Sequence, residues 1–338
     1  MNRIGLVAIG RNEGKRLHQC LLSVIGKVDH IVYVDSGSTD GSVELALRLG
    51  VAVVELDMSI PFTAARARNA GFFELRFEHP EVEYIQFIDG DCEVVSGWIE
   101  AAALALDANP KAVAVCGWRR ERYPDRSIYN RICDVEWRMG SVGPTLSFGG
   151  DVMIRAQALA AVGGYDRSVI AAEDDELSVR LRRAGGTLLR IDRDSTLHDA
   201  DMHRVLQWWQ RARRCGYAFA QVSHMHGSLP ERKFIKEIRR TWLWGGVIPL
   251  VALSLTLPTH GLSLIVFGRY PLTALRAIYK TRQRGLTFAD SCSWGLSCAV
   301  SVFPEAIGAL GFHLNRLGNK QHSILEYKGP QAPIKQAI

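Results

Sequence analysis

Short apolar runs alternate with segments of helical spacing along the first third of the chain, and this alternation restricts the fold more than any other feature of the sequence. The runs that we expect to form strands are Ile4–Ile9, Ile31–Val34, Val51–Leu56, Tyr84–Ile88 and Ala112–Cys116. Between them, segments such as residues 64–77 and 98–106 read as helices. Because strands that alternate with helices pair in parallel, the pattern predicts an α/β fold with a mostly parallel sheet and helices on both faces.

Polar residues directly follow three of these strands. Asn12 and Glu13 come after the first strand, residues 35–42 (DSGSTDGS) after the second, and residues 89–91 (DGD) after the fourth. Ligands of such sheets bind just beyond the carboxyl ends of the strands, so one shared ligand could touch all three clusters. The turn after the first strand, GRNEG, lacks the GxGxxG pattern of dinucleotide-binding folds, and the chain has no GxxxxGK[ST] P-loop.

Asp89 and Asp91 form an Asp-x-Asp sequence at the end of a buried strand, and Asp35 ends a neighbouring strand. Carboxylate oxygens suit Mg²⁺ or Mn²⁺, and a nucleoside diphosphate would complete the coordination shell. In many turns the same sequence only hydrogen-bonds the backbone. At this position in the sheet we expect it to bind a divalent cation.

Six motifs occur in the order that one known family shows, over roughly residues 1–215. They are VDSGSTDGS (34–42), ARARNAG (65–71), FIDGDCE (87–93), SFGGDVMIRA (147–156), VGGYDRS (162–168) and AAEDDELSVRLRRAGG (171–186). The chain resembles the family 2 glycosyltransferases. The resemblance implies the GT-A fold, with a mostly parallel, Rossmann-like sheet, and a nucleotide-sugar donor.

By this resemblance, the first half of the domain holds the donor and the metal. The residues expected to bind the nucleotide sugar are Asn12, Glu13, Asp35, Ser36, Gly37, Ser38, Arg68 and Asp89. Asp35 is expected to hydrogen-bond the nucleobase, a uracil, and Asp89 to contact the ribose side. Asp91 is expected to be the main ligand of Mn²⁺ or Mg²⁺, with Asp89 beside it and His198 as a further ligand. The alternatives are a solvated helix position for Arg68 and a structural role for His198.

Glu173 and Asp174 match the Glu-Asp pair of the family, in which the second residue is the catalytic base. Transfer with inversion needs a carboxylate that takes the proton of the acceptor hydroxyl, and a cation that stabilises the departing diphosphate. The like charges of residues 173–176 favour a raised pKa for at least one carboxyl, which suits a base. Asp175 is the alternative base. An acidic first turn that complements the helix dipole would explain the run without catalysis.

Two groups of residues are candidates for the acceptor site. They are Gly149, Gly150 and Asp151, and the helical residues Gln207, Trp208 and Arg211. Glycines let the backbone approach a sugar closely, and Asp151 could accept a hydrogen bond from a hydroxyl group. The helical group loosely resembles a Gln-x-x-Arg-Trp element of cellulose-synthase-like proteins, since aromatic faces pack on sugar rings and Arg could hold a phosphate. The alternatives are a turn aspartate and an amphipathic helix with buried tryptophans.

The net charge of +6 is concentrated in one region. Within residues 204–284, 14 Lys or Arg residues stand against two acidic residues, and this basic charge brackets the apolar segments 242–257 and 262–267. Each segment is shorter than the roughly 20 residues that cross a bilayer. Because both outer ends are basic, we expect a helical hairpin that enters the membrane from the cytoplasmic side, with residues 291–312 as a weaker candidate. A soluble helical subdomain is the alternative. The charge accompanies no nucleic-acid motif, so we expect no nucleic-acid partner.

These observations predict two regions and one function. Residues 1–225 form the GT-A domain, with a nucleotide-sugar half (1–117) and an acceptor half (118–225), and residues 226–338 form a basic, apolar helical region. The expected function is inverting transfer of a sugar from a UDP-sugar to a glycan or lipid-linked acceptor, at the cytoplasmic face of the membrane, in polysaccharide or cell-envelope glycan synthesis. Transfer to polyprenyl phosphate and a non-catalytic, membrane-bound sugar-binding scaffold are the alternatives.

Overall fold

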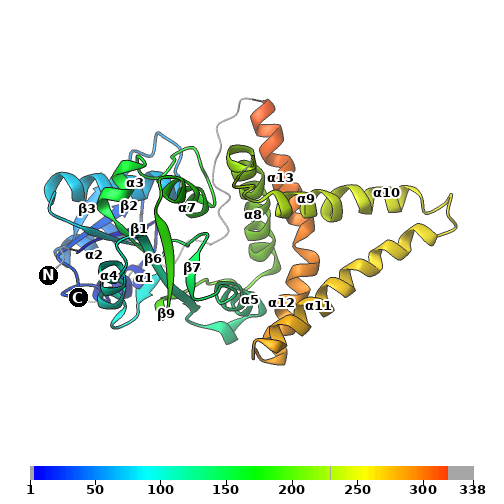
Figure 1. The fold of residues 1–338 in the computed structure, drawn as a ribbon, viewed down its shortest axis with the longest axis horizontal. Helices are drawn as coiled ribbons and strands as arrows, with labels where there is room; N and C mark the ends of the chain where they lie inside the picture. The colour runs from blue at the N-terminus through cyan, green and yellow to red at the C-terminus, as the bar shows by residue number, and fades with distance from the viewer. Residues whose placement is uncertain (1–3, 229, 319–338) are drawn as a thin grey trace. The chain divides into compact units, whose positions relative to one another are not determined.

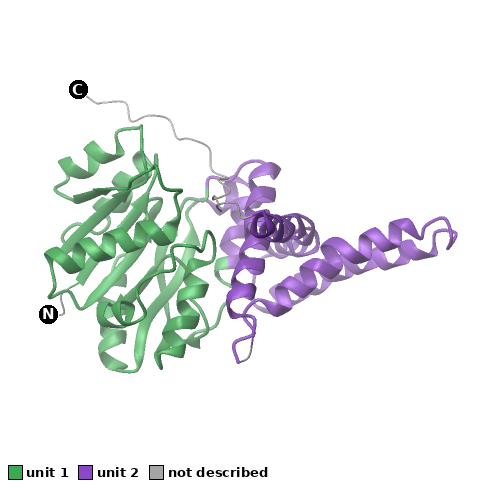
Figure 2. Ribbon diagram, turned by 90° about the horizontal axis from the view of Figure 1, so that it is seen from above, with its two compact units in different colours: residues 1–122, 137–200, 329–338 green, residues 123–136, 201–328 purple. Residues whose placement is uncertain are grey.

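The computed structural model describes residues 4–228 and 230–318 of the 338-residue chain. The described residues form two compact units, one of residues 4–122 and 137–200 and the other of residues 123–136, 201–228 and 230–318 (Figure 2). This division falls before the boundary predicted at residue 225, because helix α8 (Val205–His226) packs against α13 (Val302–Leu317) in the second unit.

Within the described residues, the first unit contains one sheet of nine strands (Figure 1). The strands are β1 (Ile4–Gly10), β2 (His30–Asp35), β3 (Ala52–Glu55), β4 (Tyr84–Asp89), β5 (Cys92–Val94), β6 (Ala112–Glu121), β7 (Gly143–Thr145), β8 (Val152–Arg155) and β9 (Thr187–His198). Their order is β3-β2-β1-β4-β8-β6-β9-β5, with β7 paired to β9. The first four strands are parallel, β6 and β9 are parallel to each other, and β8, β5 and β7 run antiparallel to their neighbours. The predicted strands are confirmed, and three of the four parallel pairs lie in the half of the sheet that precedes β8, while the fourth, β6 with β9, lies beyond it.

Helices cover both faces of this sheet, as predicted. One face carries α1 (Lys15–Leu22), α2 (Ser42–Arg48) and α4 (Trp98–Ala108), and the other carries α3 (Ala64–Glu78), α6 (Ala156–Ala161) and α7 (Glu173–Arg183). Side chains alternate between the two cores along β1, since Leu6 and Ala8 pack on the first face while Val7 and Ile9 pack on the second. The fully apolar strands of the sequence are therefore strands that are buried on both sides.

Strand register brings the polar ends of the strands together. Gly10 at the end of β1 pairs with Asp35 at the end of β2, and Ile9 pairs with Asp89 at the end of β4. Helix α3 lies close to β1, because a Cβ on Gly71 would come within 2.4 Å of Val7 Cγ1. The first half of α3 therefore runs beside the same edge of the sheet.

The second unit is helical. Its elements are η1 (Pro124–Arg126), α5 (Ile128–Trp137, up to residue 136), α8, α9 (Ile235–Trp242), η2 (Leu243–Val247), α10 (Ile248–Ser254), η3 (Leu262–Gly268), α11 (Arg269–Gln283), α12 (Phe288–Val300) and α13. Helices α8 and α13 touch at two glycines: a Cβ on Gly216 would lie 1.9 Å from the Glu305 carbonyl oxygen, and a Cβ on Gly308 would lie 1.9 Å from that of Arg213. Small residues at the crossing let the two backbones approach closely.

A helical hairpin extends from this bundle, as the sequence predicted (Figure 1). One arm consists of α9, η2 and α10, the turn covers residues 255–261, and the other arm consists of η3 and α11. None of the helices that the structure describes is, by itself, long and apolar enough to cross a bilayer. Helices α12 and α13 together, bent by 42° at their junction, pass that test by length and composition.

Candidate active site

The loop after β2 is built around Asp35. Its side chain is buried, and one oxygen accepts a hydrogen bond from the Tyr33 hydroxyl (2.9 Å) while the other accepts from the backbone N–H groups of Gly37 (2.9 Å) and Ser38 (2.8 Å). Gly37 has φ 82°, which a side chain would disfavour. Burial and the adjacent Asp35 carboxylate raise the pKa of Tyr33. Asp35 therefore fixes the shape of the loop at the sheet edge.

Asn12 ties the loop after β1 to the loop after β2. Its backbone N–H donates to Ser38 Oγ (2.8 Å), and its side-chain oxygen accepts from the Thr39 N–H (2.7 Å). Asn12 adopts φ 54°, which Asn tolerates better than most residues. Next to it, Glu13 forms an ion pair with Arg16 (2.7 Å). The residues predicted to bind the nucleotide from these two loops thus lie together along one edge.

Arg68, on α3, lies at the centre of a cluster of carboxylates from two other elements, β4 and α7. Its Nη2 donates to Asp89 Oδ1 (2.9 Å), and its Nη1 donates to Glu173 Oε1 (2.5 Å) and lies 3.6 Å from Asp174 Oδ1. The guanidinium also lies over the Tyr165 ring, 5.5 Å from its centroid. Arg68 is only 2% exposed. The alternative of a solvated helix position is therefore wrong, and Arg68 joins α3, β4 and α7 around one point.

Asp174 faces this cluster from the first turn of α7. The Tyr165 hydroxyl donates to its Oδ1 (3.3 Å). Burial raises the pKa of Asp174 to about 8; the charge of Arg68 opposes the shift, and that of Glu173 adds to it. Farther along the helix, Glu176 is engaged by Arg180 (2.6 Å), one turn away. Asp174 therefore accepts from Tyr165 and lies beside Arg68, while its role as the base, with Asp175 as the alternative, stays a prediction.

Asp91 and His198 are the part of the described site that best fits a metal ion. Antiparallel pairing of β5 with β9 sets Cys92 opposite His198, and Asp91 Oδ2 lies 3.4 Å from His198 Nε2. Two ligand atoms that share a cation at about 2.1 Å lie roughly 3.0–3.4 Å apart, so this spacing fits one ion. The other ring nitrogen of His198 lies 3.8 Å from Glu121 Oε2, a carboxylate that can orient the imidazole.

Cys92 completes this group of potential ligands, but its chemistry differs. Its Sγ lies 3.6 Å from Asp91 Oδ1 and 3.8 Å from Asp151 Oδ1. Burial, followed by the charge of Asp151, raises the pKa of the Cys92 thiol. A neutral thiol donates to carboxylates and is a poor ligand for a hard cation. The nitrogen and oxygen atoms of His198 and Asp91 are therefore the better candidates for metal ligands.

Arg119, which is partly buried, and Asp151, which is buried, form a second ion pair beside Asp89. Arg119 donates to Asp151 through Nε (2.7 Å) and Nη2, and the same Nη2 lies 3.4 Å from Asp89 Oδ2. The Thr196 hydroxyl also donates to Asp151. Although burial alone would lower it, the surrounding carboxylates, Asp151 first, hold the pKa of Arg119 well above its usual value. Asp151, which we predicted as an acceptor residue, is thus held by Arg119 and Thr196.

Gly150 closes over the two arginines. A Cβ at this position would lie 2.6 Å from Arg68 Nη2, 3.1 Å from Arg119 Nη2 and 3.2 Å from Asp89 Oδ2. At the neighbouring Gly149, a Cβ would meet no atom within 4 Å. The two glycines of the SFGGD motif therefore have different roles, and only Gly150 lies against charged side chains of the site.

The comparisons with known proteins agree with this geometry. The family model described as "Glycosyl transferase family 2" matches residues 7–162. Residues 7–162, a little under half of the chain, therefore match a family 2 glycosyl transferase domain. The predicted family 2 glycosyltransferase domain is therefore confirmed for these residues, and the solved structures reported below confirm the predicted GT-A fold.

Two curated relatives match the glycosyltransferase domain in part. The succinoglycan biosynthesis protein ExoA of Rhizobium meliloti is 29% identical over 191 residues, which are 53% of this chain and 57% of the relative. A TPR repeat-containing protein of Synechococcus elongatus is 29% identical over 133 residues, 39% of this chain and 31% of the relative. The chain thus matches about half or less of the length of these relatives.

Solved glycosyltransferases share the fold. The mannosyltransferase PcManGT of Pyrobaculum calidifontis, whose structure is a complex with GDP-Man and Mn²⁺, is 19% identical to this chain. The match covers 91% of this chain and 87% of the PcManGT chain, with a TM-score of 0.58. The structure of residues 1–349 of S. aureus TarS is 14% identical, and the match covers 94% of this chain and 92% of the TarS fragment, with a TM-score of 0.50. At these identities the likeness is one of fold.

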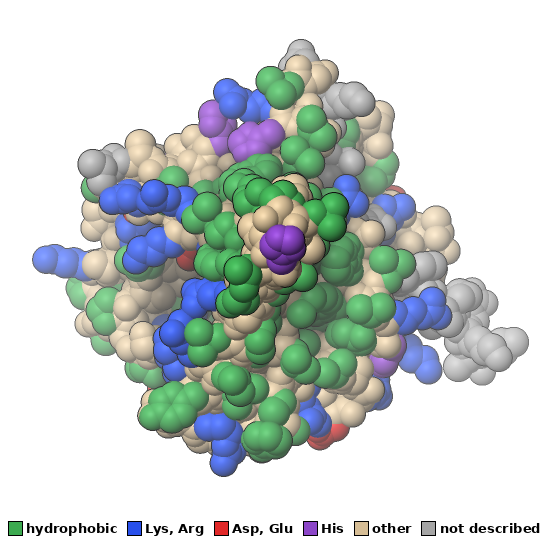
Figure 3. Space-filling view, turned by 90° about the vertical axis from the view of Figure 1, so that its right-hand side faces the viewer, with side chains coloured by type: hydrophobic (Ala, Val, Ile, Leu, Met, Phe, Trp, Pro, Cys, Tyr) green, Lys and Arg blue, Asp and Glu red, His purple; other side chains and the backbone are tan. Residues whose placement is uncertain are grey.

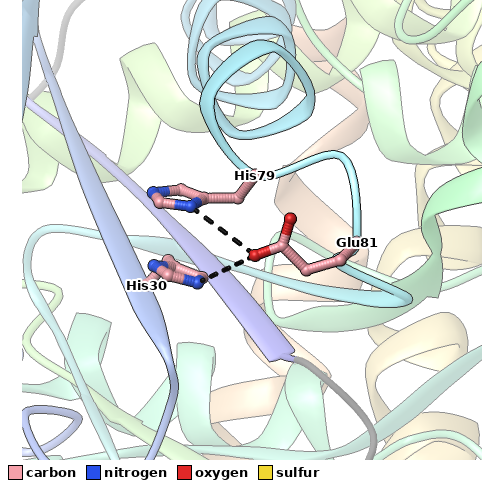
Figure 4. Close-up of side chains that lie close together, drawn as sticks. All are labelled: His30, His79 and Glu81. Atoms are coloured by element: carbon pink, nitrogen blue, oxygen red, sulfur yellow. Dashed lines mark ion pairs between the residues drawn. The ribbon is translucent and has the colours of Figure 1, made fainter.

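Another histidine cluster of the glycosyltransferase domain lies away from this edge. His30, at the amino end of β2, stacks on His79 with ring centroids 3.4 Å apart and planes inclined by 13° (Figure 4). Glu81 Oε1 lies 3.7 Å from His30 Nε2 and 3.8 Å from His79 Nδ1. Stacked rings direct their nitrogen lone pairs side by side rather than toward one point. We therefore interpret this group as a histidine pair that shares a carboxylate.

The predicted acceptor residues of α8 make their contacts inside the second unit. Gln207 caps the helix, since its side-chain oxygen accepts from the backbone N–H groups of residues 203 and 204. Trp208 is buried and donates to Ser297 Oγ (3.2 Å), and Arg211 forms two hydrogen bonds with Glu136 (2.7 and 3.0 Å). These contacts match the amphipathic-helix alternative, and an acceptor role for the three side chains stays a prediction.

Sequence reasoning missed two residues of the glycosyltransferase site. Arg119 lies beyond the predicted end of its strand at Cys116, because β6 continues to Glu121. Tyr165 lies in the VGGYDRS motif. The Asn69 side chain donates to the Tyr165 carbonyl and accepts from the Tyr165 N–H (2.8 Å each), which fixes the position of the Tyr165 ring beside Arg68. For Tyr165 the available signal was a tyrosine within a glycine-rich motif, whereas no local sequence pattern marks Arg119.

Proposed function

We propose that the chain is an inverting glycosyltransferase that moves a sugar from a UDP-sugar to a glycan or lipid-linked acceptor at the cytoplasmic face of a membrane. The observation that carries this proposal is the convergence of donor, metal and base residues at one sheet edge. A single side chain, that of Arg68, donates to Asp89 and Glu173 and lies 3.6 Å from Asp174. Residues distant in sequence would then act on one bound molecule.

The metal in this proposal is Mn²⁺ or Mg²⁺, held by Asp91 and His198 with Asp89 beside them. When bound, the cation would stabilise the negative charge that develops on the departing nucleoside diphosphate. The 3.4 Å separation of Asp91 Oδ2 and His198 Nε2 supports this arrangement. The Mn²⁺ in the complex of PcManGT, a protein of the same fold, also supports it.

The proton chemistry in this proposal belongs to Asp174. With a pKa of about 8, roughly one Asp174 carboxyl in ten is ionised at pH 7, and the fraction rises with pH. The ionised carboxylate takes the proton of the acceptor hydroxyl as the new glycosidic bond forms. Arg68 and the Tyr165 hydroxyl hold the Asp174 side chain in position. Glu173, bonded to Arg68, fixes the same guanidinium from the other side.

The acceptor and the location rest on separate support. ExoA, which matches half of the chain, is a succinoglycan biosynthesis protein, and this supports a glycan acceptor in polysaccharide synthesis. The basic charge around the apolar hairpin supports a cytoplasmic membrane surface, since anionic headgroups attract Lys and Arg near apolar segments.

Donor hydrolysis with the purified full chain tests the proposal. We expect release of UDP from one member of a panel of UDP-, GDP- and dTDP-sugars, dependent on Mn²⁺ or Mg²⁺ and lost in excess EDTA. A GDP-sugar as the preferred donor, as in PcManGT, would correct the base and keep the reaction class. No turnover of any donor, with sugar binding retained, would overturn the proposal in favour of a non-catalytic scaffold.

A further inference from the structure

A cavity of about 390 Å³ lies in the second unit, between the base of the hairpin and the α12–α13 junction. Four cationic side chains line it: Arg240 from α9, and Arg269, Arg276 and Lys280 from α11. No Asp or Glu is among its lining residues. A cavity of this size can hold a small ligand or the polar end of a larger one.

Most of this positive charge has no carboxylate partner. Arg240 pairs with Glu305, whereas the Arg269 guanidinium lies over the Trp244 ring, 5.2 Å from its centroid. The side chains of Arg276 and Lys280 form no hydrogen bond or ion pair with any residue that the structure describes. Guanidinium and ammonium groups that converge in this way bind phosphate, through paired and single charge-assisted hydrogen bonds respectively.

The surroundings of the cavity favour a phosphate carried by a lipid. No Lys, Arg, Asp or Glu occurs in residues 241–268, which form most of the hairpin. Large apolar side chains there are exposed: Leu250 (69%), Leu257 (87%), Leu262 (68%) and Ile265 (73%). Figure 3 shows hydrophobic side chains over the projecting hairpin, with Lys and Arg beside them. An exposed apolar tip with a cationic base matches the acyl and headgroup layers of a membrane leaflet.

We propose that this cavity binds the phosphate of an anionic membrane lipid. The apolar tip of the hairpin would lie among the acyl chains, and Trp244 and Tyr270 in the cavity wall would contact the carbon stem that joins the phosphate to the lipid. This inference rests on the membrane association proposed above. It adds a specific site for one lipid headgroup to the general attraction between the basic residues and an anionic membrane surface.

The test measures binding of the full chain to vesicles by flotation. Vesicles of phosphatidylcholine carry either phosphatidic acid or oleic acid, at matched surface charge, so that only the first set presents an anionic phosphate. We expect the wild-type chain to prefer phosphatidic acid. The variant Arg276→Gln/Lys280→Gln removes two cavity charges; at about fivefold per cation, it should weaken binding to phosphatidic acid by about 25-fold.

The matched control is Lys236→Gln/Arg239→Gln, which removes two exposed charges from α9 that do not line the cavity. Both variants are compared with the wild type by thermal melting, to establish that they fold. The control should keep the preference for phosphatidic acid over oleic acid, while the cavity variant loses it.

Three outcomes would overturn the proposal. Equal loss in both variants would mean that binding depends on diffuse surface charge. Equal binding of the wild type to phosphatidic acid and oleic acid vesicles, with inorganic phosphate bound in titration calorimetry by the wild type and not by the cavity variant, would assign the cavity to a soluble anion. Absence of binding to either vesicle would refute membrane association. Sugar-nucleotide turnover is measured in detergent without vesicles, so failure of the proposed reaction is distinguishable from all three.

Discussion

The substitution Gly150→Ala tests whether the position of Arg68 organises the site. The new Cβ would lie 2.6 Å from Arg68 Nη2, where carbon and nitrogen atoms normally keep about 3.5 Å. Either the guanidinium or the loop must therefore move by nearly 1 Å, since Arg119 Nη2 (3.1 Å) and Asp89 Oδ2 (3.2 Å) close the remaining directions. A shift of that size breaks the 2.9 Å hydrogen bond between Arg68 and Asp89.

Two magnitudes follow from this overlap. Overpacking of a closed site costs about 1–3 kcal/mol in the free energy of unfolding. A displacement of about 1 Å in a group that positions a substrate can cost about 10²-fold in rate. We therefore expect Gly150→Ala to lower kcat for donor hydrolysis by about 10²-fold, with a smaller effect on folding.

Gly149→Ala is the matched control, because a Cβ at Gly149 meets no atom within 4 Å. Both variants are assayed for donor hydrolysis without acceptor, so that the predicted acceptor role of Gly149 does not enter, and both are melted thermally. Gly149→Ala should melt and hydrolyse donor like the wild type. If Gly150→Ala also does so within twofold, then the contacts of Arg68 do not organise the reaction and the reasoning fails.

Three further predictions concern the base, the metal and the helical unit. Because Asp174 acts as a base only when ionised, kcat should rise with pH with a midpoint of about 8, and Asp174→Asn should abolish this rise and lower kcat by about 10²–10⁴-fold. The folded-state pKa of Asp174 lies above the usual value of 3.8, so the stability that this group contributes should fall between about pH 4 and pH 8, and melting curves of Asp174→Asn should lack this fall. Asp91→Ala should weaken binding of Mn²⁺ and, in its presence, of UDP, as titration calorimetry can measure, and unchanged activity of the wild type in excess EDTA would contradict the metal role. In a denaturant titration, Gly308→Ala should lower the free energy of unfolding by about 1–3 kcal/mol, because its Cβ would meet a carbonyl oxygen at 1.9 Å. The control Gly311→Ala, whose Cβ would meet no atom within 4 Å, should raise the free energy of unfolding by about 0.5–1 kcal/mol.

The donor half of the site was predictable because its signals are local in sequence. Each strand of the parallel half is a single apolar run, and each residue predicted to bind the donor lies at or near the end of its strand, as Asp35 and Asp89, the last residues of β2 and β4, do. In such a sheet the carboxyl ends of neighbouring strands meet, so pattern and topology together place these residues. The resemblance to a known family added the roles, and these roles, that of Asp174 included, stay predictions.

The mixed half of the sheet was less predictable because its site residues pair across strands. The antiparallel pairing of β6 with β8 brings Arg119 to Asp151, and the local sequence around either residue does not indicate this contact. The predicted end of the strand at Cys116 followed the end of the apolar run, whereas β6 continues through polar residues that pair with β9. Tertiary pairing, rather than hydrophobic periodicity, decides where such a strand ends.

The segment after residue 200 shows a different limit of sequence reasoning. For Trp208 and Arg211 the sequence predicts either an acceptor contact or a place in an amphipathic helix, because aromatic and guanidinium groups suit sugars and phosphates as well as they suit a helix bundle. In the structure, Trp208 bonds to Ser297 and Arg211 to Glu136, partners 89 and 75 residues away in sequence. A side chain that can either bind a ligand or stabilise a helix bundle is assigned only when its partners are known. The cations of α11 show the converse case: among the residues that the structure describes, Arg276 and Lys280 line a cavity and have no carboxylate partner, and this absence of an internal partner is what favours an external phosphate.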